Sequence, residues 1–141
     1  VQQAVTEGAV ISEFPTTLEA AKEARTHGLK NLMGAPNLVL GKSHSGNVSA
    51  RELAELDLVD LISSDYVPHS LLLSIFIIAS STNKPVYEAM RPVTINPATA
   101  IGLDGDRGSL DVGKRADFLT AHLEGHTPRI TSVVSQGQRI A

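Results

Sequence analysis

Residues 8–28, GAVISEFPTTLEAAKEARTHG, place a short apolar run, a turn and a helix-forming run in immediate succession. The apolar run, Gly8 to Glu13, predicts a strand, and the alanine, leucine and charged residues after the turn predict a helix over Leu18 to His27. Either threonine of the turn can cap this helix, and Gly28 can adopt the left-handed conformation that ends it. The stretch is therefore predicted to form one strand–loop–helix unit.

The same unit is predicted twice more along the chain. Its elements are a strand at Leu29 to Met33, loops GAPN (34–37) and GKSHSGN (41–47), a helix at Ser49 to Leu56, a strand at Asp60 to Ser64 ended by Asp65, and an apolar helix from Ser70. Three units in series predict an α/β fold with parallel strands and right-handed crossovers.

The pattern changes at Asn96. The run NPATAIGL predicts a short helix, and the glycine-punctuated runs after it predict mostly β structure. We therefore place a boundary near residues 95–105 and expect two parts, an α/β part over 1–104 and a small β part over 105–141.

Composition excludes several classes of partner. A formal net charge of -3, no tryptophan and only two tyrosines argue against nucleic acid binding. The absence of cysteine excludes thiolate nucleophiles and cysteine metal sites from this chain and fits a cytoplasmic location. The longest apolar run, Leu71 to Ala79, is about half of the roughly 20 residues that span a bilayer, so we expect no membrane insertion.

The carboxyl ends of parallel strands are where α/β folds carry their functional residues. Glu13 and Asp65 end the first and third predicted strands, and Asn37 and His44 follow the second. Asp65 is the strongest candidate, because a strand-end carboxylate can bind a divalent cation and accept a proton from water. The alternative for Asp65 is capping of the next helix, and the alternative for Glu13 is an ion pair with a basic residue.

Histidines are the remaining candidates. His44 lies among small residues whose backbone N–H groups can face an anion, and the alternative is an exposed residue without a role. His69 follows Asp65 closely and can touch substrate or simply face solvent. His122 and His126 have the spacing of zinc ligands on a helix, but Gly125 and the β pattern argue against a helix there.

The stretch NPATAIGLDGDRGSLDVGKRAD, residues 96–117, resembles the signature with which amidohydrolase-superfamily enzymes leave their barrel and enter a small β domain. Within the superfamily, SEFPTT (12–17), MGAPN (33–37), SHSGN (43–47) and SSDYVPHSLL (63–72) are similar to diphosphatases of the bacterial carbon-phosphorus lyase pathway of phosphonate catabolism. This resemblance covers nearly the whole chain.

The resemblance implies the C-terminal part of a (β/α)8 TIM barrel, about three βα units, followed by part of a small β-sandwich. It also implies a metal-dependent hydrolase that releases diphosphate from a phosphorylated ribose carrying methylphosphonate, with zinc or manganese as the cation. Asp65 matches the strand-eight aspartate that binds metal and serves the attacking water, and Glu13 stands where many relatives place another metal ligand. The implied substrate-binding residues are Asn37, His44, Ser45, Asn47 and His69.

Other metal ligands of the superfamily have no counterpart in this sequence, so we expect this segment alone to be inactive and an N-terminal portion to precede Val1. Uncovered edges and faces of a partial barrel, around Val10, Ile11, Leu61 and Ile62, also lead us to expect a homo-oligomer or aggregation. Two alternatives remain open: another amidohydrolase, either a cyclic amidase or a deaminase, and a non-catalytic small-molecule binding module.

Overall fold

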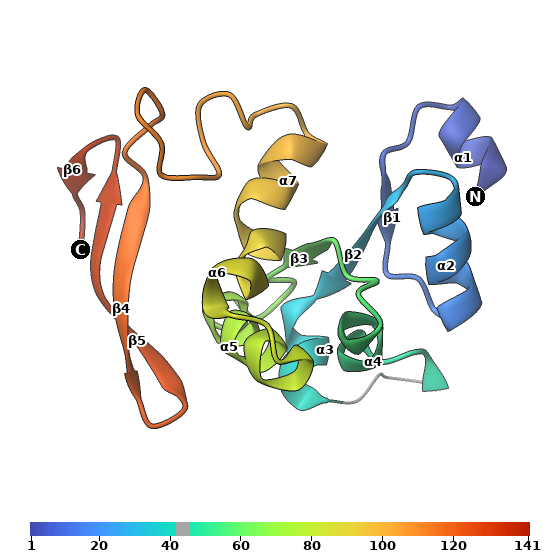
Figure 1. Cartoon of the computed structure of the whole chain (residues 1–141), viewed down its shortest axis with the longest axis horizontal. Coiled ribbons are helices and arrows are strands. Elements are labelled where there is room, and N and C mark those ends of the chain that lie inside the picture. Colours follow the sequence, from blue (N-terminus) through green and yellow to red (C-terminus); the bar gives the residue numbers. More distant parts are fainter. Residues whose placement is uncertain (42–45) are drawn as a thin grey trace.

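The computed structural model describes residues 1–41 and 46–141. A parallel sheet with its helices is followed by an antiparallel sheet (Figure 1). The elements are α1 (Gln2–Thr6), β1 (Ile11–Glu13), α2 (Leu18–Thr26), β2 (Lys30–Gly34), α3 (Ala35–Leu40), α4 (Ala50–Glu55), β3 (Leu61–Ser63), α5 (Ser70–Thr82), α6 (Val86–Ala89), η2 (Arg91–Val93), α7 (Ile95–Ala100), β4 (Phe118–Glu124), β5 (Thr127–Ser135) and β6 (Gln138–Arg139). The predicted α/β class with a β tail is confirmed, whereas α1, α6 and η2 were not predicted.

The parallel sheet has the strand order β1-β2-β3, so the strands lie in the order of the chain. Glu13 pairs with Leu32, and Gly34, the last residue of β2, pairs with Ser63, the last residue of β3. All three carboxyl ends therefore meet at one edge of the sheet, as the sequence predicts.

Helix α2 begins as its sequence predicts. The Thr17 side chain accepts a hydrogen bond from the Ala20 N–H over 3.1 Å, and Glu19 lies in the first turn. Gly28 has a φ of +80°, the left-handed conformation expected beyond the end of the helix, which ends at Thr26. Local capping chemistry therefore sets both ends of this helix.

The loop predicted at residues 34–37 is wrong. Helix α3 begins at Ala35, directly after the last residue of β2, with Gly34 as its N-cap and a proline in its first turn. Proline is favoured there because its fixed φ suits the first helical turn. A backbone N–H at this position has no hydrogen-bond partner within the helix, so the lack of one in proline costs nothing. The buried side chains of Ala35 and Leu38 then anchor the helix in the core, so Asn37 lies on a helix.

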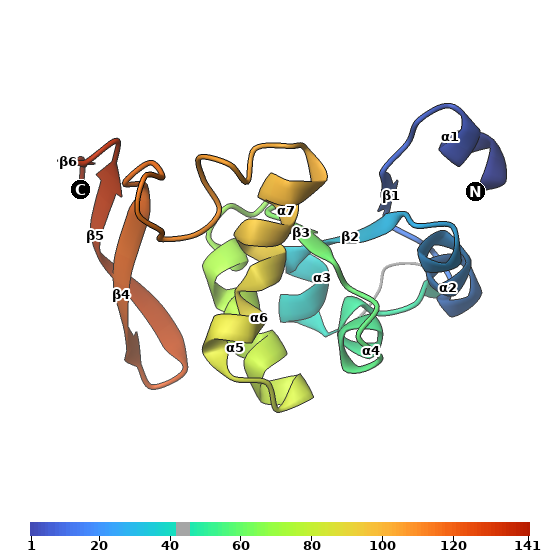
Figure 2. The same cartoon turned by 45° about the horizontal axis from the view of Figure 1, so that its top comes forward.

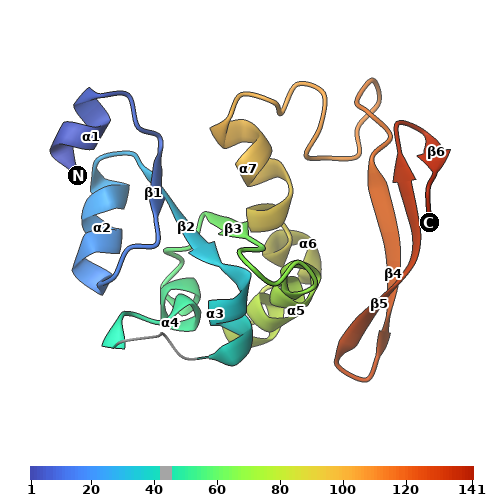
Figure 3. The same ribbon diagram turned by 180° about the vertical axis from the view of Figure 1, so that it is seen from behind.

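Helices α3, α4 and α5 pack against one another to form the main core (Figure 3). Leu38 and Leu53 are fully buried there, together with Met33 of β2. Leu61 and Ile62 are also buried, at 1% and 6% exposed, so the expectation that their faces are uncovered is wrong. Val10, by contrast, is 53% exposed.

The antiparallel sheet of β4, β5 and β6 lies at the opposite end of the molecule from α1 and α2 (Figure 2). Every residue of β4 is exposed. The predicted boundary between the α/β part and the β part, at residues 104/105, lies in the linker between α7 and β4. The division of the chain into these two parts stays a prediction. No helix in residues 1–41 and 46–141 has the length and apolar character needed to cross a membrane.

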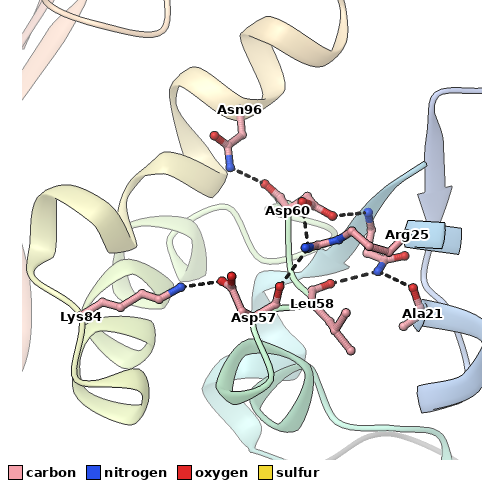
Figure 4. A network of polar contacts seen from close by, with 8 residues as sticks. Ala21, Arg25, Asp57, Leu58, Asp60, Lys84 and Asn96 are labelled. Atoms are coloured by element: carbon pink, nitrogen blue, oxygen red, sulfur yellow. Dashed lines mark hydrogen bonds and ion pairs between the residues drawn. The ribbon is translucent and has the colours of Figure 1, made fainter. Parts of the chain in front are cut away.

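A polar network ties the elements together beside the start of β3 (Figure 4). Asp60 accepts hydrogen bonds from Arg25 Nη2 and from the Asn31 N–H, each over 2.9 Å. The fully buried Asn31 donates from Nδ2 to the Ala21 and Leu58 carbonyl oxygens, and Asn96 donates to the Asp60 carbonyl oxygen. The network therefore joins α2, β2 and α7 at the end of the sheet opposite to the strands' carboxyl ends.

Candidate functional site

A pocket of about 190 Å³ opens where the parallel strands end. Most of its walls are apolar, and its polar side chains are two asparagines, one carboxylate and one tyrosine. The residues lining it are Phe14, Pro15, Met33, Gly34, Pro36, Asn37, Leu40, Asn47, Val48, Asp65 and Tyr66. Segments that follow all three parallel strands therefore contribute to one concave surface.

Asp65 lines this pocket and is exposed. Its φ of +49° is in the left-handed region, which carries a cost for residues other than glycine, although aspartate tolerates it better than most. The predicted alternative, capping of α5, is wrong: His69 stands at the N-cap of α5, and no side chain caps that helix. The carboxylate is thus held at the pocket by an unusual backbone conformation rather than by a helix end.

Gly34 separates Asp65 from Phe14. A Cβ built on Gly34 would lie 3.2 Å from Asp65 Oδ2 and 3.4 Å from Phe14 Cε1. Phe14 has a φ of +51°, an outlier for an aromatic residue, and its N–H donates to the Leu32 carbonyl oxygen over 2.9 Å. The ends of β1 and β3 therefore turn sharply toward the last residue of β2.

Asn37 and Asn47 both line the pocket, as their predicted substrate-binding roles require. Asn37 Oδ1 accepts the Ala50 N–H over 3.2 Å, which ties α3 to the first residue of α4. The Arg51 guanidinium donates to the Leu38 carbonyl oxygen over 3.3 Å and strengthens the same connection. These two hydrogen bonds therefore hold the end of β2–α3 and the start of α4 together beside the pocket.

Not every predicted residue lies in the pocket wall. His44 and Ser45 fall outside the described residues. Glu13 and His69 are exposed, and neither belongs to the described lining. The ion pair considered for Glu13 is not among those formed within residues 1–41 and 46–141.

His122 and His126 lie on a hairpin rather than a helix, as the sequence predicts. His122 is in β4, and its Nε2 lies 3.3 Å from Glu124 Oε1, while His126 is in the turn before β5. Within the part of the chain that the structure describes, no three His, Asp or Glu side chains gather as metal ligands. Among the described residues, Asp65 is therefore the one carboxylate that lines the pocket.

Phe14, Gly34 and Tyr66 are among the pocket residues that were not predicted from the sequence. Each belongs to a motif that was examined for its polar members, SEFPTT, MGAPN and SSDYVPHS. The sequence does contain signals that point to these residues. Phe14 and Tyr66 directly follow the candidate carboxylates Glu13 and Asp65, and Gly34 ends a buried strand, where glycine often marks the close approach of another group.

The linker between the two sheets is held close to α7. A Cβ on Gly108, whose φ is +88°, would lie 2.7 Å from Ala98 Cβ. Asp106 accepts hydrogen bonds from Arg107 Nε and Nη2 over 2.7 and 3.0 Å, and these bonds lower the pKa of the Asp106 carboxyl below its ordinary value. Ser109 donates to Asp111 and lowers the pKa of that carboxyl in the same way.

Known proteins resemble the chain over nearly its whole length. It is 51% identical to the alpha-D-ribose 1-methylphosphonate 5-triphosphate diphosphatase of Escherichia coli K12 over 135 residues. The matched region covers 94% of this chain and 35% of that protein. It is 33% identical to an imidazolonepropionase of Syntrophobacter fumaroxidans over 120 residues. This matched region covers 82% of this chain and 27% of that protein. The chain therefore spans about a third of the length of these relatives.

Solved structures share the fold. A prolidase crystallised with N-methylphosphonate-L-proline has a TM-score of 0.67 at 19% identity, over 98% of this chain and 41% of that one. An amidohydrolase from Thermotoga maritima MSB8 has a TM-score of 0.59 at 14% identity, over 99% of this chain and 45% of that one. At these identities the likeness concerns the fold.

The matched family is consistent with all of these observations. Residues 8–140 match the family described as the Amidohydrolase family, so the match includes the parallel strands, the pocket and the linker signature. The chain belongs to the amidohydrolase family.

Proposed function

We propose that the chain is the C-terminal part of a metal-dependent phosphoanhydride hydrolase. Its substrate is alpha-D-ribose 1-methylphosphonate 5-triphosphate, from which it releases diphosphate in phosphonate catabolism. The observation that carries the proposal is the Asp65 carboxylate in a pocket at the strand ends, within a sequence 51% identical to the diphosphatase of E. coli. The three βα units are the last part of a (β/α)8 barrel, and β4 to β6 are part of a small β-sandwich.

Asp65 fits one ligand position of the implied zinc or manganese ion, because carboxylate oxygens suit such cations and this one faces the pocket. Glu13 is the second proposed ligand, and the remaining ligands would come from polypeptide equivalent to the parts of the relatives that this chain does not span. A bound divalent cation supplies Lewis acidity that lowers the pKa of water and polarises a phosphoryl oxygen.

The chain's own residues then bind substrate and move a proton. The Asp65 carboxylate accepts the proton of the attacking water, while the amides of Asn37 and Asn47 donate hydrogen bonds to substrate oxygens. His44, Ser45 and His69 are the other proposed contacts to ribose or phosphate oxygens. Met33, Pro36 and Val48 form an apolar part of the pocket wall beside these polar groups.

The test uses the protein produced from the complete gene. We expect 31P NMR to show diphosphate release from the ribose triphosphate, and Asp65→Asn to reduce kcat by about 10²–10⁴-fold, since it removes a general base. Asp104→Asn, at an exposed carboxylate outside the pocket, is the matched control and should leave kcat unchanged.

A second candidate is hydrolysis of a cyclic amide, which the similarity to an imidazolonepropionase favours. Turnover of a cyclic amide without diphosphate release from any triphosphate would establish this alternative in place of the diphosphatase.

The 141-residue chain alone gives a separate test. We expect it to release no diphosphate and to bind zinc and manganese weakly, because Asp65 and Glu13 are too few ligands for a working site. A tight stoichiometric site in isothermal titration calorimetry would contradict the proposal that further ligands come from elsewhere.

A further inference from the structure

Gly34 stands between two side chains that approach it from opposite strands. Asp65 Oδ2 and Phe14 Cε1 lie 3.2 and 3.4 Å from the position that a Cβ on Gly34 would occupy. The first distance is tighter than ordinary van der Waals contact, and the second lies at its lower limit. The missing side chain therefore leaves a volume that the carboxylate and the aromatic ring share.

The backbone of Gly34 does not itself require glycine. Its φ of -79° and ψ of 133° are extended values that any residue adopts. Nine of the other ten glycines in the chain have a positive φ, and the exception is Gly105. Glycine at position 34 is thus explained by the space it leaves rather than by its conformational freedom.

Phe14 closes the side opposite Asp65. Its φ of +51° and the hydrogen bond from its N–H to Leu32 fix its backbone against β2. Pro15, which follows, is buried and restricts the chain further. A methyl group at position 34 would meet the ring on one side, so the Asp65 carboxylate would have to move on the other.

We propose that Gly34 and Phe14 are positioning residues that set where the Asp65 carboxylate lies in the pocket. Gly34 provides the space and Phe14 provides the opposing wall, and neither takes part in proton transfer. The catalytic consequence rests on the proposed function, in which Asp65 accepts a proton from the attacking water. The geometric claim does not rest on the proposed function, because it concerns only the contacts among Gly34, Phe14 and Asp65.

The geometric claim is tested by NMR on this chain with Gly34→Ala. We expect the Asp65 carboxyl 13C resonance and the Phe14 ring resonances to shift. Gly105→Ala, which also lacks a positive φ and has no atom within 4 Å of its Cβ position, should leave both unchanged. Phe14→Leu removes the opposing ring and should also shift the Asp65 resonance. Unchanged Asp65 resonances in both site variants would overturn the proposal.

The catalytic consequence is tested with the protein from the complete gene. Because the carboxylate must move by a few tenths of an ångström, we expect Gly34→Ala to lower kcat by about tenfold with KM nearly unchanged. The melting temperature should not fall, since alanine suits this backbone. Gly105→Ala should retain both constants.

The outcomes separate the two proposals. Shifted Asp65 and Phe14 resonances in a protein that releases no diphosphate would leave the positioning claim standing and remove the proposed function. An active protein whose kcat is the same in Gly34→Ala and Gly105→Ala would overturn the positioning role alone.

Discussion

The Asp60 carboxylate lies 2.9 Å from Arg25 Nη2 and also accepts the backbone N–H of Asn31 (Figure 4). The Asp60 side chain is only 14% exposed, while that of Arg25 is 38% exposed. Both carboxylate oxygens therefore have donors, which offsets the cost of removing this charge from water. The pair fixes α2 to the start of β3.

Asp60→Asn should lower the free energy of unfolding by about 2–3 kcal/mol. The asparagine NH2 group would replace one of the two accepting oxygens, so it would face a donor, either the Arg25 guanidinium or the Asn31 N–H. Asp57→Asn is the matched control: Asp57 is 77% exposed and pairs with Lys84, and we expect a change of about 0.5 kcal/mol or less. Urea unfolding measures both. Equal losses in the two variants would contradict a special role for Asp60.

Leu53 and Leu56 provide a test of the core at α4. Leu53 is fully buried and Leu56 is 50% exposed. Leu53→Ala should lower the free energy of unfolding by about 2–5 kcal/mol through lost burial and a cavity, and Leu56→Ala by less than about 1 kcal/mol. Chemical denaturation of the two variants side by side checks this, and a smaller loss for Leu53→Ala would place the core elsewhere.

Gly108 and Gly113 separate backbone strain from close packing. Both have a positive φ, +88° and +91°, but only Gly108 has close neighbours at its Cβ position, with Ala98 Cβ at 2.7 Å. Gly113→Ala should cost about 1–2 kcal/mol from the left-handed conformation alone. Gly108→Ala should cost more, because α7 must also shift. The difference in melting temperature between the two variants measures the cost of the contacts around Gly108. Identical melting temperatures would contradict such a cost.

Acid should weaken the linker through Asp106. Arg107 lowers the pKa of this carboxyl, so its contribution is present above the unfolded value of about 3.9 and is lost as pH falls through the lower folded value. Wild type should therefore exceed Asp106→Asn in stability near neutral pH, with the gap closing below about pH 4. Urea unfolding across this range is the measurement, and a gap that persists at pH 2 would show another origin.

Asn37 can be tested for its structural role apart from substrate binding. Its Oδ1 accepts the Ala50 N–H, an interaction that Asn37→Asp retains and Asn37→Ala loses. We expect Asn37→Ala to be less stable than Asn37→Asp by about 1 kcal/mol. Similar thermal unfolding of both variants would mean that this bond contributes little.

Local signals predicted much of the fold. Thr17, Gly28 and the apolar runs identified α2 and the three parallel strands, because capping and periodicity act over a few residues. The short helix α3 was missed because Ala35 and Pro36 favour a turn as readily as a first helical turn. Burial of Leu38 against α5, a contact distant in sequence, decides between them.

The candidate site was predicted in part for a similar reason. Strand-end position identified Asp65 and Asn37, since parallel strands must share a carboxyl edge. Phe14 and Tyr66 were missed because their place in the pocket depends on the turns after the strands. The positive φ of Phe14 runs against the preference of an aromatic residue, so no local signal predicts it.

The direct passage from β2 into α3 has a consequence for insertions. Because no linker separates Gly34 from Ala35, the helix moves with the sheet, and one inserted residue would rotate everything after it by about 100° around the helix axis. Asn37 would turn out of the pocket, whereas an extra residue in the chain between α3 and α4 leaves the orientation of α3 intact. Sequence length should therefore be far less variable at this junction than a few positions later.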